Sequence, residues 1–177
     1  MKRQPLVLAA LLLSLALTGC GNRSLGNKID DQFLEPAVAS KIRAAHVDLE
    51  STTSHVVVTS YNGVILLAGQ TPRQELKDRA EQAARSVHGV RRVENELQIM
   101  LPNSALARSN DALLTTRIKT RMLADTTVPG SKIKVVTENG IVYLMGIITR
   151  QEGARASNLV ASVNGVQKIV RVFDYID

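Results

Sequence analysis

The sequence predicts an α+β fold made of two tandem copies of one small module. Three kinds of segment occur twice in the same order: a run around an Asn-Gly pair, an Arg-Gln-Glu triplet, and a Val-x-Gly-Val motif. The matched segments are 61–69 with 138–146, 73–75 with 150–152, and 87–90 with 163–166. Ordered self-similarity of this kind is the signature of a duplicated unit. We therefore expect one module twice, over about 34–100 and 110–177.

The N-terminal segment predicts a secretory signal peptide over 1–19. Lys2 and Arg3 precede an apolar stretch from Leu6 to Leu17 that contains a single serine. A basic start, a short apolar run and small residues before the cut are typical of such signals. A helix of that length spans ~18 Å, well short of the ~30 Å bilayer core. The segment is therefore expected to be removed rather than to anchor the chain.

Cys20 is the only cysteine of the chain and ends the tetrapeptide Leu17-Thr18-Gly19-Cys20. This tetrapeptide resembles the lipobox of bacterial lipoproteins. The resemblance implies that the thiol receives a diacylglycerol, that the chain is cut before Cys20, and that the new amino group is acylated. The alternatives are a cysteine that merely ends a signal peptide, or one buried as a small apolar residue. By resemblance to the sorting of enterobacterial lipoproteins, Gly21 instead of Asp implies export to the outer membrane, on its periplasmic face, rather than retention at the inner membrane.

The first helix of each module is expected over about 36–46 and 110–124. Apolar residues four apart predict its buried stripe, formed by Val38 and Ile42 in one copy and by Leu114, Ile118 and Met122 in the other. This spacing aligns Lys41-Ile42-Arg43 with Arg117-Ile118-Lys119. Asn110-Asp111 is expected to cap the second of these helices. Residues 20–35, just before Pro36, are expected to form a tether.

Two strands should flank Asn62-Gly63, and two more should flank Asn139-Gly140. Asn-Gly between β-rich runs predicts a type I′ hairpin, whose central residues need positive φ. A second helix is expected over about 72–87 and 150–163, and a last strand over 91–99 and 167–175. Each module then reads α-β-β-α-β: a three-stranded mixed sheet with two helices on one face. The modules are expected over 36–100 and 110–177, joined by a linker at 101–109.

This element order, the Asn-Gly hairpin followed by a glycine six positions later, and the helix-Gly-Val ending resemble the BON domain. The resemblance covers both copies. Two such domains behind a lipobox resemble the dual-BON outer-membrane lipoproteins of Gram-negative bacteria; the osmotically inducible periplasmic BON proteins have similar modules but lack the acylated cysteine. The resemblance implies phospholipid binding and maintenance of the cell envelope, without catalysis.

No catalytic constellation is visible in the sequence. The three histidines, His46, His55 and His88, all lie in the first copy, and no carboxylates cluster at metal-ligand spacing. The serines lack a nucleophile-elbow context, and the glycines do not form a phosphate-binding loop. We therefore expect no metal, no cofactor and no enzymatic activity. The mature net charge of +4 is too small to predict nucleic-acid binding.

Charge distinguishes the two copies. Residues 30–100 carry eight Lys and Arg against ten Asp and Glu, whereas residues 108–177 carry ten against six, a net charge of +4. Opposite its expected buried stripe, the first helix of the second copy presents apolar, hydroxyl and basic side chains. These candidate lipid-contact residues are Leu113, Thr116, Arg117, Lys119, Thr120 and Leu123. The corresponding face of the first copy is expected to begin at Ala37 and to carry Ser40 and Ala44.

The sequence therefore predicts a lipid-anchored periplasmic protein that binds anionic phospholipid through its second module and supports outer-membrane integrity. Leucines would enter the headgroup boundary while cations meet phosphates. Two alternatives remain open for the leucines: packing against the first module or the linker, or ordinary exposure at the surface. The alternative function is a periplasmic protein-binding scaffold or chaperone that acts in envelope assembly or cell division.

Overall fold

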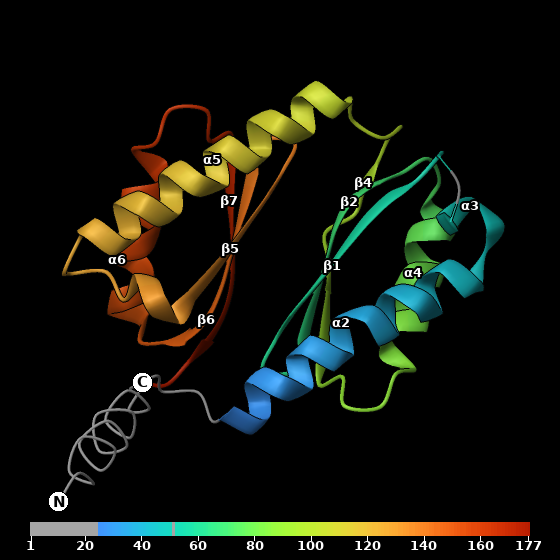
Figure 1. The fold of residues 1–177 in the computed structure, drawn as a ribbon, viewed down its shortest axis with the longest axis horizontal. Coiled ribbons are helices and arrows are strands. Elements are labelled where there is room, and N and C mark those ends of the chain that lie inside the picture. Colours follow the sequence, from blue (N-terminus) through green and yellow to red (C-terminus); the bar gives the residue numbers. More distant parts are fainter. Residues whose placement is uncertain (1–24, 51) are drawn as a thin grey trace, which may run out of the picture.

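The computed structural model describes residues 25–50 and 52–177, and it contains two mixed sheets that face each other (Figure 1). Helices cover the outer face of each sheet. The α+β class and the duplicated α-β-β-α-β module are confirmed. The predicted signal peptide and Cys20 lie outside the described residues.

The first domain holds a sheet in which β1 pairs antiparallel with β2, and both β3 and β4 pair parallel with β2. The last strand predicted over 91–99 is broken into β3 and β4, because Leu97 turns into the core between them and is almost fully buried. The elements are α2 (Leu25–Ala45), α3 (Val47–Glu50), β1 (His55–Tyr61), β2 (Val64–Thr71), α4 (Gln74–Arg85), β3 (Arg92–Asn95) and β4 (Gln98–Ile99).

The second domain repeats this arrangement with an unbroken last strand. Its sheet has the order β5-β6-β7, in which β5 is antiparallel and β7 parallel to β6. The elements are α5 (Ala105–Ala124), the 3-10 turn η1 (Gly130–Lys132), β5 (Ile133–Glu138), β6 (Ile141–Ile148), α6 (Arg150–Ala161) and β7 (Lys168–Tyr175).

Both predicted Asn-Gly hairpins are present. Asn62 and Asn139 have φ values of 53° and 54°, and the glycines that follow them have values of 75° and 71°. These left-handed conformations at both central positions are what a type I′ turn requires. The turn chemistry therefore fixes the register of the two antiparallel pairs.

Both first helices begin earlier than the sequence pattern predicts. Helix α2 starts at Leu25 and contains Pro36 in its interior, so the tether expected over 20–35 is wrong from Leu25 onward. Helix α5 starts at Ala105, within the linker expected over 101–109, and Ser104 is its N-cap: the Ser104 hydroxyl accepts a hydrogen bond from the Ala107 amide at 3.2 Å. The N-cap predicted at Asn110-Asp111 is therefore wrong.

The two first helices correspond to each other one helical turn away from the predicted alignment. The buried stripe of α2 includes Leu34 as well as the predicted Val38 and Ile42, and its residues match those of α5 in order: Leu34 with Leu114, Val38 with Ile118, and Ile42 with Met122. The glycines support this match, since a Cβ on Gly89 would meet Leu34 and one on Gly165 would meet Leu114, each at 3.7 Å. Phe33, rather than Ala37, thus occupies the position of Leu113.

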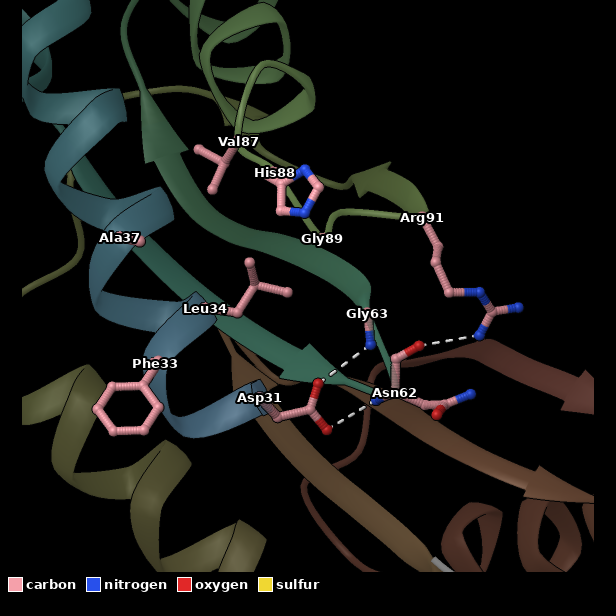
Figure 2. A pocket seen from close by; sticks show the side chains of 10 residues that line it. All are labelled: Asp31, Phe33, Leu34, Ala37, Asn62, Gly63, Val87, His88, Gly89 and Arg91. Atoms are coloured by element: carbon pink, nitrogen blue, oxygen red, sulfur yellow. Dashed lines mark hydrogen bonds between the residues drawn. The ribbon is translucent and has the colours of Figure 1, made fainter. Parts of the chain in front are cut away.

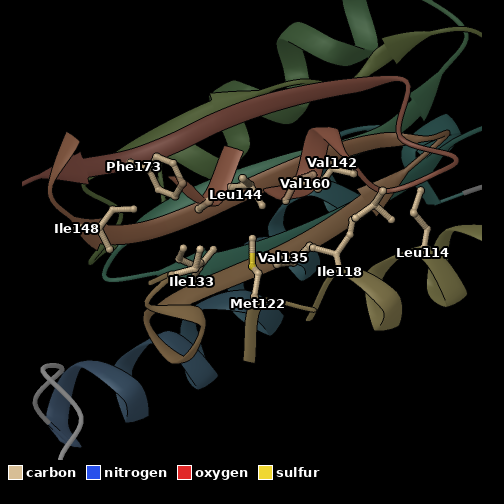
Figure 3. Packing of buried hydrophobic residues seen from close by; sticks show 13 residues of the cluster. Leu114, Ile118, Met122, Ile133, Val135, Val142, Leu144, Ile148, Val160 and Phe173 are labelled. Carbon is tan, nitrogen blue, oxygen red and sulfur yellow. The ribbon is translucent and has the colours of Figure 1, made fainter. Parts of the chain in front are cut away.

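Each domain has its own aliphatic core, and a third apolar cluster joins the two sheets. Figure 3 shows the core of the second domain, where Ile118 and Met122 of α5 pack with residues of the sheet and with Val160 of α6. The third cluster lies between the sheets and includes Tyr61, Leu66, Tyr143, Met145 and Val172. Burial of both faces of each sheet explains why β2 is buried along its whole length.

Candidate functional site

All six predicted lipid-contact residues lie on the exposed side of α5. Leu113 is 55% exposed and Leu123 is 70% exposed, so more than half of each side chain is open to solvent. Thr116, Arg117, Lys119 and Thr120 are exposed as well. The buried stripe predicted for this helix, Leu114, Ile118 and Met122, faces the core. The structure thus gathers the six side chains on one outward surface, which we call the α5 face.

The charge of the α5 face has one sign. The helix carries four basic residues, Arg108, Arg117, Lys119 and Arg121, all of them exposed. Its single acidic residue, Asp111, is 7% exposed and points inward. Arg108 and the 72% exposed Leu106 were missed by the sequence prediction because the helix was expected to start at 110. Recognition of Ser104 as the N-cap would have included both of them.

Asp111 holds the helix against the tip of the β5–β6 hairpin. Its carboxylate oxygens accept hydrogen bonds from the backbone amides of Asn139 and Gly140, each at 2.9 Å. Hydrogen bonds to a carboxylate are stronger than neutral ones. The side chain therefore fixes the N-terminal half of α5, and with it Leu113, relative to the sheet.

Asp31 does the same for α2 in the first domain. It accepts hydrogen bonds from the amides of Asn62 at 2.8 Å and Gly63 at 3.0 Å, as Figure 2 shows, and from the Ser60 hydroxyl at 2.6 Å. The hydrogen bonds from an Asn-Gly turn to a buried aspartate of the first helix are thus repeated in both copies of the module. This repetition was missed because the predicted alignment of the first helices was displaced by one turn.

Two shallow grooves flank the α5 face. One has a volume of about 430 Å³ and is lined by Thr116, Arg117, Thr120, Arg121, Val163 and Asn164. The other, of about 290 Å³, lies between α5 and the hairpin tip, and Arg117 lines it too. Arg117 thus separates the two grooves, and Leu113 lines the smaller one with it.

Polar contacts between the domains fix the α5 face relative to the first domain. The Tyr61 hydroxyl donates to the Lys132 carbonyl at 2.7 Å, and the Lys134 ammonium lies 2.6 Å from the Glu35 carboxylate. Arg92 pairs with Asp174 at 3.1 Å. Together with the apolar cluster between the sheets, these contacts present the two domains as one body.

The histidines do not form a metal site. His46 accepts a hydrogen bond from the Asp48 amide at 3.1 Å, His55 lies 3.6 Å from Glu138 of the other domain, and His88 is exposed. Within residues 25–50 and 52–177, no group of three or more His, Cys, Asp or Glu is placed to hold a metal ion. In the same part of the chain, no helix combines the length and apolar character needed to cross a bilayer.

Comparison with known proteins places the two modules in a family. The BON domain family matches residues 30–100 and 110–177. The outer membrane lipoprotein DolP of Haemophilus influenzae is 37% identical over 156 residues, which are 88% of this chain and 79% of that protein. The 21 kDa hemolysin of Actinobacillus pleuropneumoniae is 33% identical (87% and 78% covered), and osmotically-inducible protein Y of Escherichia coli is 30% identical (92% and 91% covered). The chain therefore belongs to the BON-domain family and carries two BON domains in tandem.

Proposed function

We propose that this protein is a lipid-anchored, non-enzymatic component of the outer membrane, on its periplasmic face. In this proposal it binds anionic phospholipid through the α5 face and supports outer-membrane integrity. The observation that carries the proposal is the composition of that face. Leu113 and Leu123 are exposed beside Arg117 and Lys119, and the only acidic residue of the helix is buried. Exposed leucines framed by cations combine the two contributions that bind a helix to an anionic membrane surface, namely buried apolar area and electrostatic attraction.

The energies support a weak contact of this kind. Burial of two leucine side chains contributes about 3–5 kcal/mol at full insertion. Each basic residue close to an anionic surface adds about 1 kcal/mol. Arg117 and Lys119 lie within one turn of the leucines, so both terms act on the same patch of membrane. The affinity is expected to fall with salt, because the electrostatic part is screened.

The lipobox at Cys20 and the similarity to an outer membrane lipoprotein support the proposed location. Acylation at Cys20 would place the anchor five residues before α2. A tethered surface binds its own leaflet at high effective concentration, so a weak site is occupied without strong intrinsic affinity. Replacement of Cys20 by Ser should therefore release the protein from the outer-membrane fraction, and retention there would contradict the anchor.

The lipid contact is tested with the non-acylated chain from residue 20 onward, in which Ser replaces Cys20. We expect this protein to sediment with vesicles that contain phosphatidylglycerol and not with purely zwitterionic vesicles. Leu113→Glu should abolish the association, because it places a charge in the contact. The matched control is Val47→Glu, which changes an apolar residue of the first domain that is more exposed than Leu113 (74% against 55%) and should leave binding intact.

Two results would contradict the proposal: no association of the unaltered chain with anionic vesicles, or association that Leu113→Glu leaves unchanged. Binding that ignores headgroup charge, together with a protein that copurifies in defined amount, would favour a protein-binding scaffold in envelope assembly or cell division instead.

A further inference from the structure

The first domain contains a groove with a volume of about 710 Å³ between α2 and the loop that follows α4. Its apolar walls are Phe33, Leu34, Ala37 and Val87, and His88 and Arg91 lie at the polar side. Figure 2 shows Leu34 and His88 facing the space between the helix and the loop, with Phe33 projecting from α2 at its edge. Sites for small organic ligands have volumes of about 300–1,000 Å³ and walls that are mostly apolar.

The second domain has the same groove in a divided form. Most lining residues of its smaller part have counterparts in the first domain: Asp111 with Asp31, Leu113 with Phe33, Leu114 with Leu34, Asn139-Gly140 with Asn62-Gly63, and Gly165 with Gly89. The decisive difference is Arg117, which stands where the first domain has Ala37 and lines both parts. The two parts have volumes of about 290 Å³ and 430 Å³. The same fold position is thus one continuous groove in the first domain and two smaller grooves in the second.

Gly89 forms the chain reversal at one side of the open groove. This residue has a φ of +91°, and a Cβ added to it would meet only Leu34, at 3.7 Å. The chain reversal therefore lies against α2 without a side chain between them. Leu34 and Ala37 are left as the surface that a ligand would touch.

The charges at the rim favour an acidic ligand. The carboxylate of Asp31 accepts hydrogen bonds from Ser60, Asn62 and Gly63, which stabilise it and direct it toward the hairpin tip. Arg91 donates from one nitrogen to the Asn62 carbonyl at 2.9 Å, and the same nitrogen lies 3.5 Å from Asp174. A guanidinium has five N–H donors, so this contact leaves capacity for a further acceptor. The second domain has the neutral Asn164 and Gln167 where the first has His88 and Arg91.

We propose that this groove binds one single-chain acidic lipid, with its apolar tail along Phe33, Leu34 and Ala37 and its carboxylate at His88 and Arg91. The site differs from the α5 face in domain, in ligand and in mode, since it takes one lipid molecule rather than a membrane surface. It does not depend on the proposed function of the second domain.

The test titrates the non-acylated chain from residue 20 onward, with Cys20 replaced by Ser, with oleate below its critical micelle concentration. We expect saturable amide shifts at Gly63 and Gly89, with one oleate per chain, and no such shifts at the equivalent Gly140 and Gly165. Oleyl alcohol, which has the same tail without the charge, should bind more weakly. Arg91→Gln should remove this preference for oleate.

The comparison between the domains supplies the decisive variants. Ala37→Arg introduces the residue of the second domain and should weaken oleate binding by about tenfold or more. The matched control Ala44→Arg places the same side chain on the same helix outside the groove and should leave binding unchanged. The reverse change, Arg117→Ala, should produce new oleate-dependent shifts at Gly165.

The proposal is overturned if oleate causes no saturable shift at Gly63 and Gly89, or if Ala37→Arg binds as tightly as Ala44→Arg. Unaltered amide shifts at Gly140 and Gly165 in Ala37→Arg confirm that the variant is folded. If Ala37→Arg unfolds the chain, Arg117→Ala provides the test. An absence of new oleate-dependent shifts at Gly165 would contradict the claim that the residue at this helix position determines whether the groove binds lipid.

Discussion

The two domains use one module for different surfaces, and helices α2 and α5 show the difference most clearly. Both are held to a hairpin tip by one buried aspartate, and both bury three apolar residues at the same spacing. Their remaining charges differ. Besides the buried Asp31, helix α2 carries three basic and two acidic residues, whereas α5 carries four basic residues and no acid other than the buried Asp111. The fold of the module therefore requires apolar residues on the inward side of this helix, whereas the outward residues differ between the two domains.

The interface between the domains explains how such divergence is tolerated. The sheet faces turned away from the helices pack against each other, through residues such as Leu66 and Met145. The remaining outward surfaces belong to the helices and loops. Changes on α2 or α5 that leave the inward stripe intact therefore alter binding without disturbing the core.

The largest expected effect concerns the aspartate-to-hairpin hydrogen bonds that both domains share. Asp111→Ala removes two charge-assisted hydrogen bonds and leaves the Asn139 and Gly140 amides without their acceptor. We expect a loss of about 2–4 kcal/mol in the free energy of unfolding. Asp31→Ala should cost at least as much, since Asp31 also accepts from Ser60. Urea denaturation of both variants checks this, and a loss below about 0.5 kcal/mol at either position would refute the shared role.

A smaller effect is expected where the domains meet. Tyr61→Phe removes the hydroxyl that donates to the Lys132 carbonyl while it keeps the ring in the apolar cluster between the sheets. The half-buried carbonyl loses this partner, so we expect a destabilisation of about 1–2 kcal/mol. Thermal unfolding of the variant measures it. A variant as stable as the unaltered chain would show that the hydroxyl contributes nothing to the coupling of the domains.

The smallest effect concerns a cap present in the second domain. Thr149 and Glu152 form a capping box at the start of α6, whereas Arg73 at the start of α4 makes no side-chain cap. Hydrogen bonding from the Thr149 amide lowers the pKa of Glu152. Glu152→Gln should cost about 0.5–1 kcal/mol at neutral pH.

The pH dependence of this cap follows from the direction of the pKa shift. A carboxyl whose pKa is lowered by folding stabilises the native state above its unfolded pKa, and this contribution is lost as the pH falls through the folded pKa. The difference in unfolding free energy between the unaltered chain and Glu152→Gln should therefore shrink on acidification. A difference that grows as the pH falls would contradict the assignment. Gln74→Ala, at the exposed start of α4, serves as the control with little effect at any pH.

Local signals in the sequence predicted most of the fold. The Asn-Gly pairs specified both hairpins because positive φ at two successive positions restricts the residue type. The duplication then gave the order of elements. The start of each first helix was predicted wrongly. Asn110-Asp111 suggested a cap for α5, and Pro36 suggested a boundary for α2, yet the packing of Leu34 and the bonds of Asp31 hold α2 together across Pro36. Tertiary contacts of this kind leave no local signal.

The sequence predicted only part of the candidate site, again because tertiary contacts leave no local signal. Helical spacing placed Leu113 and Leu123 outward, because their angular position is set by Leu114 and Ile118. The comparison with the first domain could not be made correctly from sequence, since the displaced alignment paired Leu113 with Ala37 instead of Phe33. The open groove beside Phe33 depends on how closely α2 and the Gly89 loop approach each other, and only the folded structure shows that distance.

The central claim is that the outer surface of α5, and not that of α2, contacts anionic membrane. Amide shift mapping of the non-acylated chain on lipid nanodiscs tests it most directly, with phosphatidylglycerol compared with phosphatidylcholine. We expect headgroup-dependent shifts and broadening at Leu113, Thr116, Arg117, Lys119, Thr120 and Leu123, and none along the equivalent residues 33–43 of α2. Equal perturbation of both helices, or perturbation that does not depend on headgroup charge, would contradict the account.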